Sequence, residues 1–65
     1  MLQRGDVVEV RDWRGELLVA RVWQAVGEGV TVCSEAEYQR AVSTAAEPLY
    51  VGWPMKDVLR VVPPS

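Results

Sequence analysis

A Gly-aromatic-Pro step near the C-terminus constrains the fold more than any other feature of the chain. The step is Gly52-Trp53-Pro54, and an apolar run lies on each side of it. Proline fixes its φ angle and has no N–H to donate to a sheet, so the preceding strand must end at Pro54. The short segment from there to Val58 suits one 3₁₀ turn, after which strand pairing resumes. This arrangement predicts a small β-barrel whose last two strands are joined by that turn.

The length of the chain predicts one small domain, residues 1–65. A domain of this size buries only about 60% of the surface that its unfolded chain exposes. Disulfides, a metal ion or self-association usually add stability to such domains. The chain has one cysteine, Cys33, and no histidine, so an internal disulfide and an ordinary zinc site are both excluded. We expect no metal and no cofactor, which leaves self-association as the source of extra stability.

Charge and hydropathy disfavour nucleic acid and membranes as partners. The formal net charge is −2, whereas domains that bind nucleic acid are usually strongly basic. The basic residues are scattered among acidic ones rather than clustered: Arg4, Arg11, Arg14, Arg21, Arg40, Lys56 and Arg60. No apolar signal segment precedes the first strand, and no apolar run approaches the ~20 residues of a membrane span. We expect a cytoplasmic protein whose Cys33 is reduced.

Runs of β-branched and alternating residues predict a mainly β fold with five strands. The predicted strands are Val7–Arg11, Glu16–Trp23, Val30–Cys33, Leu49–Trp53 and Val58–Val62. A tight hairpin turn at Asp12–Gly15 joins the first two, with Gly15 free to adopt a positive φ. The first three strands form a meander, since Gly27-Glu28-Gly29 is a second turn.

The segment from Ser34 to Ala46, between the third and fourth strands, has two interpretations. Ser34 followed by Glu37 fits a capping box, and the alanines and charges favour a short helix from Glu35 to about Val42. The alternative is an excursion loop, because the residues from Ser43 to Pro48 show no periodicity. Both interpretations leave the five-stranded architecture unchanged.

Strand alternation predicts which side chains form the core. The inward residues are expected to be Val8, Val10, Val30, Val32, Leu49, Val51 and one or two of Val58, Leu59 and Val61. The second strand is apolar on both faces, because Leu18, Ala20 and Val22 alternate with Leu17, Val19, Arg21 and Trp23. A sheet with one solvated face should instead alternate apolar and polar residues. The stripe of Leu17, Val19 and Trp23 is therefore either buried under the Ser34–Ala46 segment or a surface for self-association or another partner.

The segment Gly52-Trp53-Pro54-Met55-Lys56-Asp57-Val58 resembles the closing segment of SH3 domains. In those domains glycine, an aromatic or aliphatic residue, proline, three residues and valine lead into the last strand, and Pro54 and Val58 match that spacing. The resemblance implies a five-stranded, partly open SH3-like barrel, here with a short helix or excursion loop between strands three and four and a 3₁₀ turn before the last strand. It does not extend to peptide binding, because the tyrosine that precedes that valine in SH3 domains is Asp57 here.

A second resemblance is to the plasmid-encoded (type II) dihydrofolate reductases, which are tetramers of small SH3-like barrels. The matching stretches are Gly5-Asp6-Val7-Val8 and Val32-Cys33-Ser34-Glu35-Ala36. That family's pore chemistry depends on a valine-glutamine-isoleucine-tyrosine strand, and the comparable Leu49-Tyr50-Val51-Gly52 lacks the glutamine. The chain is also similar in style to short uncharacterised bacterial proteins with a valine-cysteine, acidic-tyrosine and glycine-aromatic-proline pattern, which imply no function.

No catalytic constellation is evident in the sequence. Without histidine, acid–base chemistry would fall to carboxylates, a lysine or a cysteine. Cys33 lies in a β-run, where cysteine is usually a small buried apolar residue. Gly27-Glu28-Gly29 lacks the glycine, lysine and helix of a phosphate-binding loop. These features predict a protein that is not an enzyme.

Aromatic residues are the remaining candidates for a binding site, because they bury a large rigid area at small entropic cost. Trp13 is expected at a hairpin tip, where it is either functional or folded back over the barrel. Trp53 is expected to close the barrel. Tyr50 should face outward, near Trp23. The candidate binding residues are Trp13, Trp23, Tyr50, Leu17 and Val19.

Three functions follow as hypotheses. The first is a non-catalytic protein-interaction module, which includes homo-oligomerisation, and it follows from the two-sided apolar strand and the outward aromatics. The second is a nucleic-acid-associated barrel, which fold analogy favours and charge opposes. The third is an oligomeric enzyme with a site at a subunit interface, which rests on the reductase resemblance alone.

Overall fold

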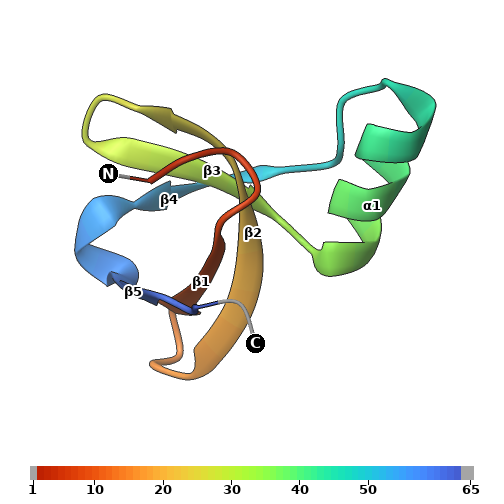
Figure 1. The fold of residues 1–65 in the computed structure, drawn as a ribbon. Helices are drawn as coiled ribbons and strands as arrows, with labels where there is room; N and C mark the ends of the chain where they lie inside the picture. The colour runs from red at the N-terminus through yellow and green to blue at the C-terminus, as the bar shows by residue number, and fades with distance from the viewer. Residues whose placement is uncertain (1, 64–65) are drawn as a thin grey trace.

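The computed structural model describes residues 2–63 as one five-stranded antiparallel sheet with a single helix (Figure 1). The elements in chain order are β1 (Val7–Arg11), β2 (Leu17–Val26), β3 (Gly29–Cys33), α1 (Glu35–Thr44), β4 (Val51–Pro54), a 3₁₀ turn (Met55–Asp57) and β5 (Val58–Val61). The strand order in the sheet is β4-β3-β2-β1-β5. The predicted mainly β architecture is confirmed, and the sheet is open rather than closed into a barrel.

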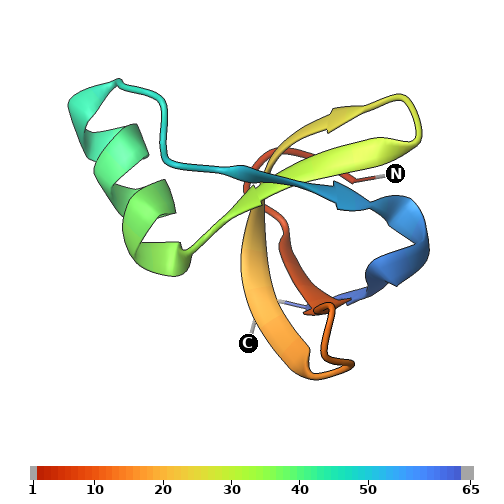
Figure 2. The ribbon, with the colours of Figure 1, turned by 180° about the vertical axis from the view of Figure 1, so that it is seen from behind.

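Strand β2 belongs to both halves of the sheet. Its first half, Leu17–Arg21, pairs with β1, and its second half, Arg21–Val26, pairs with β3. The strand curves strongly between the two halves, as the view from behind shows (Figure 2). It runs three residues beyond the predicted end at Trp23, because the chain reverses only at Gly27, whose φ is 58°.

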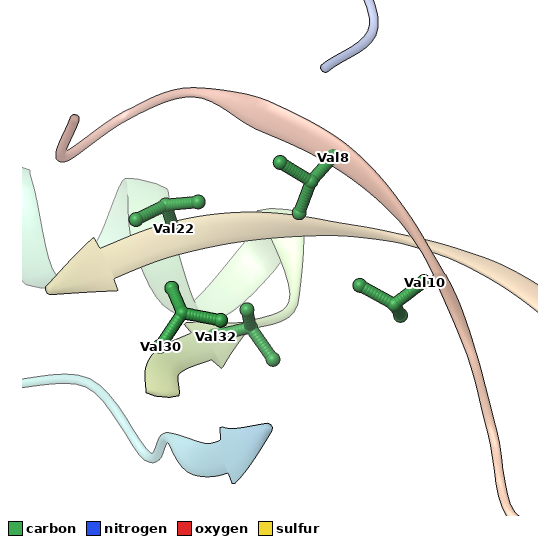
Figure 3. Packing of buried hydrophobic residues seen from close by; sticks show 5 residues of the cluster. All are labelled: Val8, Val10, Val22, Val30 and Val32. Atoms are coloured by element: carbon green, nitrogen blue, oxygen red, sulfur yellow. The ribbon is translucent and has the colours of Figure 1, made fainter. Parts of the chain in front are cut away.

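The core consists of five buried valines whose side chains converge between β1, β2 and β3 (Figure 3). They are Val8, Val10, Val22, Val30 and Val32. Partly buried side chains that pack against them are Leu2, Ala20, Trp53 and Val58. The inward positions predicted in the first and third strands are confirmed, and Val58 supplies the predicted contact from the last strand.

The prediction that Leu49 and Val51 belong to the core is wrong. Leu49 is 78% exposed and Val51 is 60% exposed. Leu49 precedes β4, in the coil that returns from α1, so strand alternation does not apply to it. Val51 lies opposite the buried Val32, but β4 is an edge strand, and within residues 2–63 no strand pairs with its outer side. Trp53 packs against the core from β4 instead.

The Ser34–Ala46 segment is a helix rather than a loop. The Ser34 hydroxyl accepts a hydrogen bond from the Glu37 N–H at 3.1 Å, which is one half of the predicted capping box. Ala45, at φ 56°, ends the helix in the left-handed conformation. Ala41 is the buried residue of α1. The helix therefore begins where the sequence predicts and continues two residues beyond Val42.

The Gly-Trp-Pro step ends β4 and leads into the predicted 3₁₀ turn, but it does not close the sheet into the predicted barrel, because β4 and β5 do not pair. Strand β4 ends at Pro54 and the 3₁₀ turn leads directly into β5. The Trp53 indole Nε1 donates a hydrogen bond to the Arg11 carbonyl at 3.1 Å. The Met55 N–H donates to the Glu28 carbonyl at 3.3 Å. Strand β4 is one edge of the open sheet. These two bonds connect it to β1 and to the β2–β3 turn.

Candidate functional site

An apolar groove of about 320 Å³ opens on the inner side of the sheet, between the first half of β2 and the start of β4. Its deepest residues, Val10, Val32 and Cys33, are buried. Leu18 and Val51 form its exposed apolar walls. The further lining residues are Val19, Ala20, Ser34, Leu49 and Trp53. Cys33 is the one residue of this lining with an ionisable side chain, and burial raises the pKa of its thiol, so the thiol is neutral at neutral pH. A partner can therefore enter the groove without removing a charge from water.

The groove exists because β3 is shorter than β2. Strand β3 reaches back only to the Arg21↔Cys33 pair, after which the chain leaves the sheet for α1 (Figure 1). The first half of β2 therefore pairs with β1 on one side, and no strand within residues 2–63 pairs with its other side. The excursion that the sequence predicts after Cys33 is what exposes this strand edge.

Two of the predicted binding residues, Leu17 and Val19, lie on the outer face of the same half-strand. Leu17 is 53% exposed and Val19 is 65% exposed, so α1 does not cover them. Leu18, between them, is 43% exposed on the inner face. Leu18 is not among the binding residues that the sequence predicts, although the apolar character of both faces of this strand was a signal for it. The exposed apolar surface therefore wraps around the unpaired edge of β2.

Trp23, the third residue of the predicted stripe, is engaged by its own chain. The Arg4 guanidinium lies 4.1 Å from the ring centroid, and the Arg4 Nε donates to the Trp23 carbonyl at 2.8 Å. The Tyr38 ring of α1 meets Trp23 edge to face, with centroids 6.3 Å apart. Burial under the helical excursion thus applies to Trp23. Its aromatic partner is Tyr38, and not Tyr50 as predicted.

Tyr50 lies beside the groove, in the coil between α1 and β4. It is 46% exposed, and it sits between the two exposed groove residues Leu49 and Val51. Tyr50 is exposed, as predicted, but it is less exposed than Leu49 and Val51, so the alternation on which that prediction depended does not hold in this segment. In this short segment Leu49 and Val51 line the groove beside the unpaired edge of β2, and Tyr50 is not among the lining residues.

Trp13 stands at the tip of the β1–β2 hairpin and is 90% exposed. The Asp12 carboxylate builds this turn, because its Oδ1 accepts hydrogen bonds from the backbone N–H groups of Arg14 at 2.9 Å and Glu16 at 2.8 Å. The Arg14 guanidinium lies 5.5 Å from the Trp13 ring centroid. The alternative in which Trp13 folds back over the barrel is wrong, since the ring lies in solvent.

Replacing Trp13 with alanine is expected to change the free energy of unfolding by less than about 0.5 kcal/mol, because an exposed side chain makes few native contacts. Chemical denaturation of wild type and Trp13→Ala measures this difference. A loss above 1 kcal/mol would show that the ring packs on the domain.

Cys33 contributes to the groove as a small apolar residue. It is buried, with 5% of its surface exposed, and its Sγ lies 3.9 Å from the Arg21 carbonyl oxygen. Burial raises the pKa of the Cys33 thiol, and the neighbouring Glu37 carboxylate acts in the same direction. The thiolate form needed for nucleophilic attack is thus disfavoured at neutral pH.

A polar cluster attaches α1 to β2 on the outer face. The Arg21 guanidinium donates to the two Glu35 carboxylate oxygens at 2.7 and 3.2 Å and to the Gly5 carbonyl at 2.7 Å. Its Cζ atom also lies 4.6 Å from the Tyr38 ring centroid. The hydrogen bonds with Glu35 raise the pKa of Arg21, and those from Arg21 and Gln39 lower the pKa of Glu35. These charged groups are satisfied internally.

Glu37 anchors the return of the chain from α1 to β4. Its carboxylate accepts hydrogen bonds from the Arg40 guanidinium at 2.8 and 3.2 Å and from the Leu49 N–H at 2.9 Å. The hydrogen bonds from Arg40, followed by the one from Leu49, lower the pKa of Glu37 from 4.5 to about 2. This contact fixes Leu49, and with it one wall of the groove.

Because the folded-state pKa of Glu37 lies below its unfolded value, its stabilising contribution is complete above about pH 4.5 and is lost as the pH falls toward 2. Glu37→Gln is therefore expected to unfold at a lower temperature than wild type at pH 6, and the difference should shrink as the pH falls through this window. Thermal unfolding followed by circular dichroism from pH 6 to pH 2 measures it. A difference that is independent of pH would contradict the assignment.

Within residues 2–63, no group of three histidine, cysteine, aspartate or glutamate side chains is placed to hold a metal ion. The one helix of this part of the chain, with ten residues, is too short and too polar to cross a membrane. In comparisons with known proteins, no family model, no curated protein and no solved structure matches the chain.

Proposed function

We propose that this protein is a non-catalytic interaction module that binds an extended, apolar protein segment along the first half of β2. The observation that carries the proposal is the coincidence of an unpaired strand edge with an uncharged groove at Leu18, Leu49 and Val51. Such a surface offers backbone hydrogen bonds for affinity and apolar contacts for specificity, which is how strand addition recognises peptides.

The size of the exposed apolar surface supports an interaction role. Five large apolar side chains beside the edge are at least 43% exposed: Leu17, Leu18, Val19, Leu49 and Val51. Isolated exposed apolar residues are normal on proteins, whereas a contiguous group of them marks an interaction site.

The ionisable groups support a role without catalysis. Glu35 and Glu37 are paired with Arg21 and Arg40, and these pairs lower both carboxyl pKa values rather than raising one to the range useful for a general acid or base. Cys33 is buried and its pKa is raised. These arrangements stabilise the fold and leave no activated group at the groove.

The test is selection of binding peptides from a phage-displayed random library, followed by fluorescence titration of the selected peptides. We expect apolar sequences with β-branched residues. Leu49→Lys should weaken their binding at least tenfold, because the change places a charge in the groove wall at an exposed position that the fold tolerates.

Val42→Lys is the matched control, since Val42 is 58% exposed on α1 and lies outside the groove lining. It should leave the dissociation constants within about twofold. The proposal is wrong if no peptide is enriched and the protein also does not associate with itself.

A further inference from the structure

The free edge of β2 has its hydrogen-bonding groups directed outward at two positions. The Asp12 N–H donates to the Glu16 carbonyl, and the Val22 N–H donates to the Asp6 carbonyl, both at 2.9 Å. From Glu16 to Val22, even-numbered residues therefore direct their backbone groups toward β1. Because the direction alternates along an antiparallel strand, the N–H and C=O groups of Leu17 and Val19 point away from β1, to the side that β3 leaves open.

This edge lacks the features that normally prevent strands from pairing with other chains. Proteins protect such edges with proline, lysine, inward charges or a β-bulge. The segment from Leu17 to Ala20 contains no charge and no proline, and its pairing with β1 continues without a register shift from Leu17 to Arg21. An uncharged, regular and apolar edge of this kind favours addition of another strand.

We propose that the occupant of this edge is the same edge of a second copy of the chain, joined by a two-fold axis into one continuous antiparallel sheet. The proposal rests on the interaction role proposed above and names its partner. In the register that uses the outward backbone groups, Leu17 faces Val19 of the second copy, and Val19 faces its Leu17. The two Leu18 residues then meet on the axis.

Self-complementarity is what favours a second copy over another protein. On the outer face each Leu17 covers a Val19, and on the inner face the two Leu18 side chains cover one another and fill the groove beside Leu49. Glu16 of one copy faces the uncharged Ala20 of the other, so no like charges are opposed.

The area required is within reach of this small surface. A stable dimer of standard size buries about 800 Å² on each partner. That is about a sixth of the 4595 Å² surface of the chain, and an interface along the edge would draw on the exposed side chains of Leu17, Leu18, Val19, Leu49 and Val51. A domain with a core of five valines also gains the stability that small domains usually need from another source.

The test is sedimentation velocity of the full chain from 1 μM to 500 μM. We expect the wild type to form a dimer whose population rises with concentration. Val19→Lys should raise the dimer dissociation constant at least a hundredfold, because it introduces a charge at the edge on both copies. Val26→Lys is the matched control, since Val26 is 60% exposed on the same strand but is paired with β3, and it should dimerise like the wild type.

A backbone variant separates strand pairing from side-chain contact. Val19→Pro removes the outward N–H, which is unpaired in the monomer, and keeps an apolar side chain at this position, so the backbone bonds of the even-numbered residues to β1 remain. It should be monomeric while its circular dichroism spectrum matches that of the wild type. If the wild type is monomeric throughout, or if folded Val19→Lys and Val19→Pro both dimerise, the proposal is overturned. A monomer that still binds the selected peptides would leave the proposed function standing, so the two failures are distinguishable.

Discussion

Replacing Trp53 with alanine is expected to lower the free energy of unfolding by about 3 kcal/mol, the lower end of the range for removing a packed tryptophan. Trp53 is the side chain that β4 packs against the valine core. Its Nε1 also donates the 3.1 Å hydrogen bond to the Arg11 carbonyl. A domain of this length has on the order of 3–10 kcal/mol in total, so the variant should be near its unfolding threshold at room temperature.

Trp53→Phe separates the two contributions of Trp53. It keeps most of the apolar packing and removes the Nε1–H donor, so it should cost about 1 kcal/mol, the usual net value of one hydrogen bond. Urea denaturation of wild type and both variants measures the series. Equal losses for Trp53→Phe and Trp53→Ala would show that the bond to Arg11, rather than packing, holds β4 to the rest of the sheet. Losses below 0.5 kcal/mol for both would contradict any role of Trp53 in stability.

The strands and the final turn could be predicted because local chemistry determines them. Pro54 cannot donate to a sheet, and the glycine of the first hairpin, Gly15, adopts φ 82° as its position in the turn requires. The start of α1 was predictable for the same reason, since Ser34 caps it. The end of β2 was not, because the apolar residues of its second half are compatible with either strand or coil until the β3 partner is known.

The core could be predicted in full only where strands have neighbours on both sides, whereas on the edge strand β5 the sequence left Val58, Leu59 and Val61 open and only Val58 packs against the core. Val8, Val10, Val30 and Val32 lie on β1 and β3, which are internal strands, and alternation places them correctly. For Leu49 and Val51 alternation fails, because the burial of a residue on an edge strand, or in the coil before it, depends on what covers it. That information is tertiary and does not appear in the local sequence.

The candidate site shows the same division between local and tertiary information. The two-sided apolar pattern of the second strand indicates that something other than the core meets it, and Leu17 and Val19 are indeed exposed. Trp23 has the same pattern but is covered, because Tyr38 and Arg4 reach it from distant parts of the chain. Only the topology shows that β3 stops short of Ala20, and so that the strand edge itself is free.

Replacing Gly5 with alanine is expected to cost about 3 kcal/mol, because two separate penalties add. Gly5 has a φ of 96°, which an L-residue adopts only with strain of about 1–2 kcal/mol. A Cβ atom at this position would also lie 2.8 Å from the Tyr38 Oη. Tyr38 cannot easily move away, since Arg21 lies over its ring and Trp23 meets it edge to face. The variant should therefore loosen α1 as well as the N-terminal segment.

Gly15→Ala isolates the backbone penalty. Gly15 has a similar φ of 82°, and a Cβ atom there would meet nothing within 4 Å, so the expected cost is only the strain of about 1–2 kcal/mol. Chemical denaturation of both variants gives the difference, which measures how firmly Tyr38 is held. Amide hydrogen exchange adds a local readout, because Gly5→Ala should reduce protection in α1 whereas Gly15→Ala should not. Equal costs and unchanged exchange in α1 would mean that the Tyr38 ring yields freely, and that the attachment of the helix to β2 depends on the Arg21–Glu35 pair instead.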